Sequence, residues 1–493
     1  TIARMIGDVR AWNAMDRDWR VTFRRLDERY GYAKFGGNCH IVPNHAVIIL
    51  GLVAGGGDFR ETLAIVNTCG WDTDCNSGNA GCLMGVRGGL AALELDYDWR
   101  GPLADRIFLP TADGGRCITD AAREALNVAN AGRALRGLPP LAPKGGARFH
   151  FELPGSVQGF RVGTAEGDDA GGGPTLTLAN VAGHSRAGTR SLALRYSGLG
   201  RGKSARAGTA TFIPRDALVM PGYELLASPT LYSGQHLRAS AVAGAEDAGS
   251  VRCCLYVGIY GDSDRWEIRR SPAAHLAPGK VADLAWDVPD TGGSPIAEVG
   301  IELQGEGNAG GTVFLDCVTW TGTPSLRLGI PATGGTMWQR AWVNGVTRHE
   351  TRTEPFRIVQ NEGRGLLMQG TREWKDYRVS AEITLCLVKA GGVAACVQGM
   401  RRFYALLLTE SGTARLLKCN DRDVVMAEVP FPWSQGSAHT FELHVRDGTV
   451  SGAIDGKQIG SVKDMDRPLD GGAVAFVCEE GWMTSQELRV EAF

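Results

Sequence analysis

The sequence lacks an excess of either charge, a long apolar run and a paired-cysteine motif, and each absence excludes a class of protein. Its 52 basic and 54 acidic side chains nearly cancel, so no basic surface predicts a nucleic-acid or anionic-membrane partner. The longest apolar run, Ala46 to Ala54, is far shorter than the ~20 residues that span a bilayer. We therefore expect a soluble protein that binds neither nucleic acid nor a membrane.

The cysteines and the first residues also lack familiar signals. No two of the 12 cysteines are spaced Cys-x-x-Cys, and several lie in apolar runs where a buried thiol is the usual outcome. The pattern predicts neither a disulfide framework nor a zinc site. Residues 1–10 show neither the basic start nor the apolar core of a targeting signal. Because an initial Met is also missing, we expect a processed or fragmentary chain.

Length and glycine content indicate several domains. The 493 residues leave room for about three domains, and the 68 glycines are about twice the usual share, which is typical of many turns between short strands. Apolar residues have helical spacing at first and alternate after a Pro-rich linker at 138–146 and a second hinge at 326–335. The predicted fold class is multidomain: an all-α domain at 1–137, then two all-β sandwiches at 147–325 and 336–493.

Two carboxylates one residue apart mark the most informative stretch. Asp72 and Asp74 follow the turn residue Gly70 and lie between two helical patterns. The first backbone N–H groups of the second helix hold acidic side chains in place, so both aspartates can direct oxygens to one point. Mg²⁺ or Mn²⁺ is the natural occupant of such a point. The alternative is that one Asp caps the helix and the other is solvated, which is the commoner role of a bare Asp-x-Asp.

The surrounding residues favour the metal. The run Gly57 to Gly85 resembles the C-terminal signature of the ADP-ribosylglycohydrolase family, in which Gly-Gly-Asp-Thr-Asp-Thr joins an amphipathic helix to a small-residue helix. The resemblance covers roughly residues 1 to 135 and implies a binuclear Mg²⁺ or Mn²⁺ site with Asp72 and Asp74 as catalytic metal ligands. Cys75 stands where the family has a further ligand, Thr, and is the expected third ligand. Its thiol is a softer and poorer partner for Mg²⁺.

Other parts of this site are expected nearby or on another chain. Trp71, Asn44, His45 and His40 are predicted to bind substrate, although a single His in such a place more often packs or caps a helix. The family's upstream half, with its Gly-Asp-Ala-x-Gly and Thr-Asp-Asp-Thr elements, does not occur in the sequence. We therefore expect either a companion chain that carries this half or an incomplete metal site.

The two sandwiches resemble modules found beside glycan-active enzymes. The first is similar to a carbohydrate-binding-module-like jelly roll, with its opening strand at Phe149 to Leu153, and the second is similar to a concanavalin- or laminin-G-like sandwich. Such modules favour an extracellular or periplasmic location. Candidates for stacking on sugar rings, with a core role as the alternative, are Trp266, Trp286 and Trp320.

The sequence therefore predicts a metal-dependent glycoside hydrolase of the ADP-ribosylglycohydrolase type with glycan-binding accessory domains. It is expected to cleave an N- or O-glycosidic bond to ADP-ribose or another sugar, with an ADP-ribosylated or glycan substrate. The alternative is a non-catalytic carbohydrate-binding protein that carries a degenerate hydrolase remnant. Tight glycan binding by residues 147–493, with no metal at Asp72, would favour the alternative.

Overall fold

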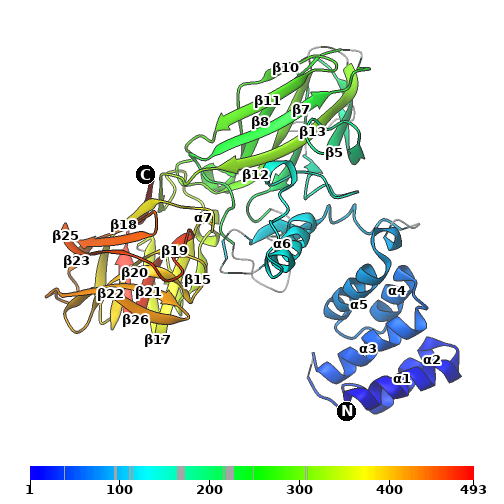
Figure 1. The fold of residues 1–493 in the computed structure, drawn as a ribbon, viewed down its shortest axis with the longest axis horizontal. Coiled ribbons are helices and arrows are strands. Elements are labelled where there is room, and N and C mark those ends of the chain that lie inside the picture. The colour runs from blue at the N-terminus through cyan, green and yellow to red at the C-terminus, as the bar shows by residue number, and fades with distance from the viewer. Residues whose placement is uncertain are drawn as a thin grey trace. The chain divides into compact units, whose positions relative to one another are not determined.

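The chain folds into two compact units, Thr1–Leu103 and Ala104–Phe493 (Figure 1). The first is helical and the second is rich in strands, so the predicted fold class is confirmed. Within the described residues no helix is long and apolar enough to cross a membrane. The computed structural model describes residues 1–37, 39–93, 97–109, 111, 113–114, 116–163, 173–214, 217, 227–247, 249–305, 307, 309–352 and 354–493.

In its described part, the first unit consists of helices around a small core. The apolar helix α3 packs against each of the other four because its residues Ala46, Val47 and Leu50 are fully buried. Two helix starts are capped by aspartates, since the carboxylates of Asp18 and Asp58 accept backbone N–H groups of the first turn. The helices are α1 (Ile2–Asp16), α2 (Trp19–Tyr30), α3 (Ile41–Ala54), α4 (Phe59–Thr68) and α5 (Thr73–Gly88).

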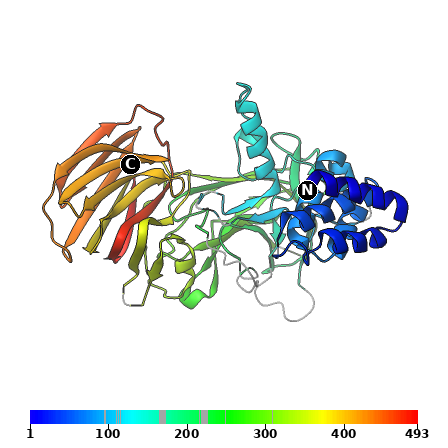
Figure 2. The same ribbon diagram turned by 90° about the horizontal axis from the view of Figure 1, so that it is seen from below.

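The second unit begins with a hairpin and a projecting helix. The hairpin pairs β1 (Arg106–Phe108) with β2 (Ile118–Asp120), and α6 (Ala121–Ala134) follows directly. Ala122 is the only buried residue of α6, and the helix stands out from the neighbouring strands in Figure 2. The sequence pattern groups these residues with the helical domain, whereas the structure assigns them to the second unit.

Two antiparallel sheets form the first sandwich. One has the strand order β11-β7-β13-β5-β4, and the other has the order β10-β8-β12-β6-β3, with β9 also paired to β8. Alternate residues of both sheets, such as Leu192, Val257 and Ile301, are fully buried between them. The strands are β3 (Arg161–Val162), β4 (Thr175–Ala182), β5 (Arg190–Leu199), β6 (Ser204–Ala210), β7 (His236–Ala243), β8 (Val251–Tyr260), β9 (Trp266–Arg270), β10 (Ala274–Leu276), β11 (Val281–Asp287), β12 (Ile296–Gly305) and β13 (Ala309–Thr321).

The expected opening strand of this sandwich, Phe149 to Leu153, is absent. Phe149 makes a single bridge to Val318. The backbone N–H groups of His150 and Phe151 then donate to the side-chain oxygen of Gln158, at 2.9 and 2.8 Å, instead of to a neighbouring strand. Phe149 and Phe151 are buried, as the sequence indicates. The Gln158 side chain, however, accepts the hydrogen bonds of the backbone N–H groups that a neighbouring strand would accept in a sheet.

The last sandwich is one sheet that bends over its own core, and its yellow-to-red strands lie in curved layers in Figure 2. The long strand β26 joins the layers, because its first half pairs with β19 and its last residues pair with β18. The elements are β14 (Leu326–Gly329), α7 (Met337–Arg340), β15 (Val343–Gly345), β16 (Arg348–Glu350), β17 (Phe356–Gln369), β18 (Tyr377–Cys386), β19 (Ala390–Val397), β20 (Arg402–Thr409), β21 (Thr413–Asn420), β22 (Arg422–Pro430), β23 (Ala438–Arg446), β24 (Thr449–Ile454), β25 (Lys457–Lys463), β26 (Ala473–Ser485) and β27 (Glu487–Ala492).

Both segments that the sequence marks as linkers are fixed to a sandwich. The Lys144 side chain is 1% exposed, and its ammonium group lies 2.7 Å from the Asp316 carboxylate and 2.6 Å from the Arg190 carbonyl oxygen. The second hinge contains β14, which pairs with β27 of the last sandwich. The prediction of a hinge over these four residues is therefore wrong, because strand pairing uses their backbone groups.

Candidate functional site

The turn between α4 and α5 gives Asp72 an unusual conformation. Asp72 occupies the N-cap position of α5, but its φ of 44° and ψ of 56° are left-handed, and its side chain accepts no capping hydrogen bond from the backbone of the helix. The N-cap residues Asp18, Asp58 and Asp120 are extended, and each accepts a backbone N–H group of its own helix. The Asp72 carboxylate is therefore not used as a helix cap, which argues against the alternative left open by the sequence.

A buried amide holds the Asp72 carboxylate instead. Asn44, on α3 and only 8% exposed, donates a hydrogen bond from its side-chain nitrogen to Oδ2 of Asp72. The Tyr32 hydroxyl in turn donates to the side-chain oxygen of Asn44. Both groups of the amide are thus used, so the Asn44 side chain has one orientation and fixes one oxygen of Asp72.

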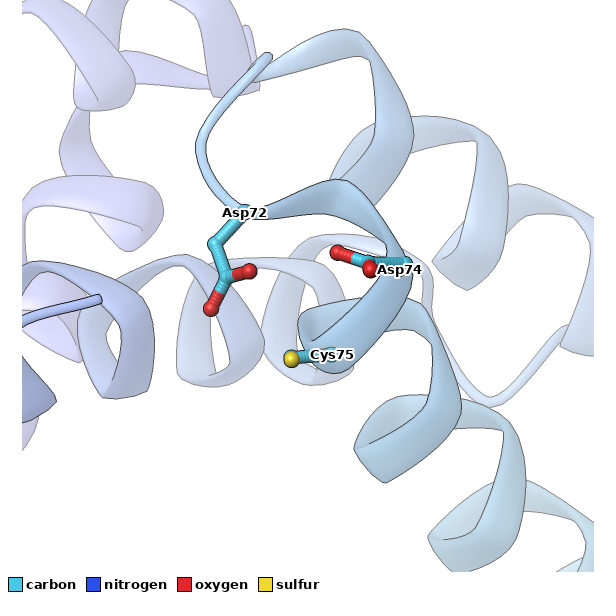
Figure 3. A group of neighbouring side chains, drawn as sticks. All are labelled: Asp72, Asp74 and Cys75. Atoms are coloured by element: carbon cyan, nitrogen blue, oxygen red, sulfur yellow. The ribbon is translucent and has the colours of Figure 1, made fainter. Parts of the chain in front are cut away.

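Asp74 and Cys75 lie in the first turn of α5 and face the Asp72 carboxylate (Figure 3). One carboxylate oxygen of each aspartate and the Cys75 sulfur all lie within 4.8 Å of one another. Two ligand oxygens on opposite sides of a Mg²⁺ ion are about 4.2 Å apart, so the span of the three groups is close to that of one coordination shell. In the described part of the chain this is the only group of three or more such side chains close enough to hold a metal ion.

The negative charge of Asp72 affects its neighbours. A hydrogen bond to Asp72, together with the charge of that carboxylate, raises the pKa of the Cys75 thiol. Burial and the same charge raise the pKa of Tyr32. Both neighbours therefore stay protonated at neutral pH. The Cys75 thiol donates to the Asp72 carboxylate, whereas the Tyr32 hydroxyl donates to the Asn44 side-chain oxygen. A bound cation would supply the compensating charge and would favour loss of the Cys75 proton.

The other predicted site residues lie near this cluster in different roles. Trp71 packs against Phe23 and Tyr32, with ring centroids 5.0 and 5.2 Å away, and is half-buried. The His40 ring nitrogen Nδ1 accepts the Val42 N–H group at 3.2 Å, so His40 caps α3, which is the alternative role that the sequence left open. His45 is half-buried on α3, one residue from Asn44. Substrate binding by these residues stays a prediction.

Sequence reasoning missed two residues that shape the site. Tyr32 orients Asn44, and its only sequence signal is a tyrosine after the helix-ending Gly31. Asn76 is 1% exposed, and its amide donates at 2.5 Å to the carbonyl oxygen of Trp71. This bond ties the first turn of α5 to the preceding turn, which stabilises the left-handed Asp72 between them.

The aromatic candidates of the first sandwich have mainly packing roles. Trp320 is 4% exposed, its ring N–H donates to the Thr230 carbonyl oxygen at 2.9 Å, and the Arg148 guanidinium lies 4.0 Å from the ring centroid. Trp266 makes an edge contact with Tyr260, and Trp286 is half-buried against the core. Trp320 is therefore a core residue and not a sugar platform.

The comparisons with known proteins match the first part of the chain to a family and the sandwiches to solved structures. Residues 2–134 match the ADP-ribosylglycohydrolase family, so the predicted resemblance is confirmed and the helical part is ADP-ribosylglycohydrolase-like. The family indicates a hydrolase. Among curated proteins no match was found.

Several solved structures resemble parts of the chain. A carbohydrate-binding module of Bacillus subtilis is 14% identical, with a TM-score of 0.27, over 31% of this chain and 94% of that one. A Bacillus subtilis protein of unknown function with a galectin-like fold is 14% identical, with a TM-score of 0.28, over 35% and 96%. The C-terminal family 22 carbohydrate-binding module of Clostridium thermocellum Xyn10B is 13% identical, with a TM-score of 0.24, over 35% and 89%.

Proposed function

We propose that the protein is a metal-dependent glycoside hydrolase of the ADP-ribosylglycohydrolase type, with glycan-binding sandwiches. The observation that carries this proposal is the Asp72 carboxylate, which is released from capping α5 and lies beside Asp74 and Cys75. A left-handed non-glycine residue costs about 1–3 kcal/mol and is typical of functional sites. The family match of residues 2–134 supports hydrolysis as the reaction at that site.

The donor set fits a divalent cation. Asp72 and Asp74 would hold Mg²⁺ or Mn²⁺ through oxygens, and the Cys75 sulfur adds a softer third ligand. A bound cation supplies a template and Lewis acid for a sugar diol and water. Asn44 keeps Asp72 oriented. In the net reaction, water adds its hydroxyl to the sugar carbon and its proton to the leaving nitrogen or oxygen of an ADP-ribosylated or glycan substrate.

A companion polypeptide would complete this site. Asp74 and Cys75 are exposed at the start of α5, and the face of the helix that carries Cys75 continues through exposed apolar side chains. Leu83 is 54% exposed and Val86 is 84% exposed, and they lie 8 and 11 residues after Cys75, which is the spacing of one helix face. A surface that carries the missing acidic groups and covers this face would bury both the ligands and the apolar residues.

The test measures metal binding and turnover in matched variants. Asp72→Ala and Asp74→Ala are expected to remove metal-dependent hydrolysis of an ADP-ribosyl or glycan substrate while both proteins remain folded. Asp58→Ala, which removes a capping aspartate from α4, is the control that lowers stability and leaves turnover intact. Native mass spectrometry shows whether a second chain is present in the active preparation. Wild-type rates in both site variants would refute the proposal.

A second candidate function is a carbohydrate-binding protein without catalysis. It is favoured by a cavity of about 860 Å³ in the second unit, lined from both sandwiches by residues that include Tyr232, Thr291, Arg327 and Arg489. Its volume is in the range of small-ligand sites. Glycan binding by the full chain with no metal at Asp72 and no turnover would support this function.

A further inference from the structure

The second sheet of the first sandwich has an outward face with two polar rows. Leu303 of β12 is fully buried in the core, so its neighbours Glu302 and Gln304 point to the opposite face of the sheet. The pairing register places Gln304 between Arg252 of β8 and Ser204 of β6. One row therefore carries a cation, an amide and a hydroxyl across three strands.

The adjacent row contains a carboxylate that arginines already neutralise. Glu302 is 1% exposed, and both of its oxygens lie 3.0 Å from Nε of Arg270. Nε of Arg206 lies 3.8 Å away, and the Gln304 amide donates to Oε1 at 2.9 Å. Glu302 is paired with Cys254 of β8, and Arg270 of β9 is paired with Tyr256, two residues farther along β8. Glu302 is thus compensated within the sheet and does not balance further cations.

A cavity of about 610 Å³ opens over these rows. Among the described residues, Arg201, Lys203, Arg252 and Arg270 line it together with Glu302 and Gln304. In the described part of the chain, Arg201 and Arg252 make no ion pair and are exposed. The cavity is much larger than one phosphate group needs, and its volume is typical of a site for a small organic ligand.

We propose that this cavity binds an acidic saccharide, whose carboxylate or sulfate groups are held by the arginines. A guanidinium group matches an oxyanion through two parallel hydrogen bonds. The Gln304 side-chain nitrogen already donates to Glu302 and Cys254, so its oxygen offers an acceptor to a sugar hydroxyl, and the Ser204 hydroxyl can donate or accept. The inference names a ligand class for the glycan-binding role proposed above and rests on that role. It does not involve the chemistry at Asp72.

The test is calorimetry of the full chain with three trisaccharides of equal length: trigalacturonate, a sulfated trisaccharide and neutral maltotriose. At least one acidic trisaccharide is expected to bind more tightly than maltotriose, and its affinity falls as NaCl is added. Arg252→Gln is expected to weaken this binding about tenfold or more, because a charge-assisted hydrogen bond is lost. Arg252→Lys keeps the positive charge but lacks the guanidinium group that makes two parallel hydrogen bonds. Its affinity is therefore expected to lie between those of the wild type and Arg252→Gln.

The control variant is Arg238→Gln, which removes an exposed arginine from β7 of the other sheet. It is expected to bind the acidic trisaccharide as tightly as the wild type. Equal affinity for maltotriose, or unchanged affinity in a folded Arg252→Gln protein, overturns the proposal. Binding of inorganic phosphate or ADP-ribose, with none of an acidic saccharide, overturns it as well. Hydrolysis is measured in a separate assay of the wild type, so failure of one proposal is distinguishable from failure of the other.

Discussion

Substitution of Asn44 by alanine tests whether Asp72 is positioned for a metal. Asn44 is 8% exposed and makes two side-chain hydrogen bonds, one to Asp72 and one from Tyr32. A hydrogen bond to a charged group contributes about 1.5–3 kcal/mol, and loss of a partner that orients a metal ligand weakens metal binding about 10- to 100-fold. The second range equals about 1.4–2.7 kcal/mol, so the two magnitudes agree. We expect Mn²⁺ binding to Asn44→Ala to weaken by that factor.

The assay is titration calorimetry with Mn²⁺ beside thermal unfolding. Asn67→Ala is the matched control, because Asn67 is an exposed amide on α4 whose side chain donates only to the Leu63 carbonyl oxygen. It is expected to leave Mn²⁺ binding unchanged. If Asn44→Ala remains folded and binds Mn²⁺ within about threefold of wild type, the Asn44 hydrogen bond does not position a metal ligand, and Asp72 is not held in place for a cation.

Three further outcomes follow from particular contacts. Cys75→Thr replaces the softest donor of the cluster with a hydroxyl, so the ratio of Zn²⁺ to Mg²⁺ affinity, measured by competition titration, is expected to fall by about tenfold. Lys144→Met leaves the buried Asp316 carboxylate unpaired and is expected to lower the free energy of unfolding, measured in urea, by about 3–5 kcal/mol. The control is Lys389→Met at an exposed site. A smaller decrease in Lys144→Met than in this control would contradict the prediction. Burial opposes ionisation of Asp464, but hydrogen bonds from Lys418 and Tyr404 hold its pKa below the ordinary value. Its stabilisation is therefore present above the ordinary aspartate pKa of ~3.9 and is lost as the pH falls through the lower folded value, so the acid-side loss of stability is expected to be shallower in Asp464→Asn.

The sequence predicts what depends on short-range spacing and misses what depends on distant contacts. The proximity of Asp72, Asp74 and Cys75 follows from their positions at one helix start. The left-handed conformation of Asp72 does not follow, because aspartate is ordinarily an extended N-cap, as Asp58 is. The support from Asn44 comes from 28 residues away, a separation at which no local pattern acts.

Prediction of the fold from the sequence is likewise limited to elements with a local pattern. Helical and alternating patterns identify the helical unit and the sandwiches, because each element buries a face of its own. The strand β14 is interpreted from its sequence as part of a hinge because its alternation covers only four residues, which are held by pairing with β27, more than 150 residues later. The expected strand after the first linker fails for the opposite reason: its apolar residues are buried, but the side chain of Gln158 takes the hydrogen bonds that a neighbouring strand would take.

In the part of the chain that the structure describes, the buried carboxylates of the first sandwich are paired with cationic side chains, whereas the carboxylates of the candidate metal site are not. Asp316 and Glu302 are each 1–2% exposed, and each lies against a lysine or arginine of the same sandwich, so neither needs a ligand. Asp72 and Asp74 make no ion pair within the described residues, and Asp72 accepts only from a neutral amide and a thiol. Two carboxylates and a thiol within 4.8 Å repel one another in their charged forms, and a divalent cation removes that repulsion. Arg201 and Arg252 likewise make no ion pair in the described ranges of the chain, and both line the cavity of the first sandwich. The proposed cation site at Asp72 and the proposed anion site at Arg252 lie in separate compact units, so each proposal is tested without reference to the other.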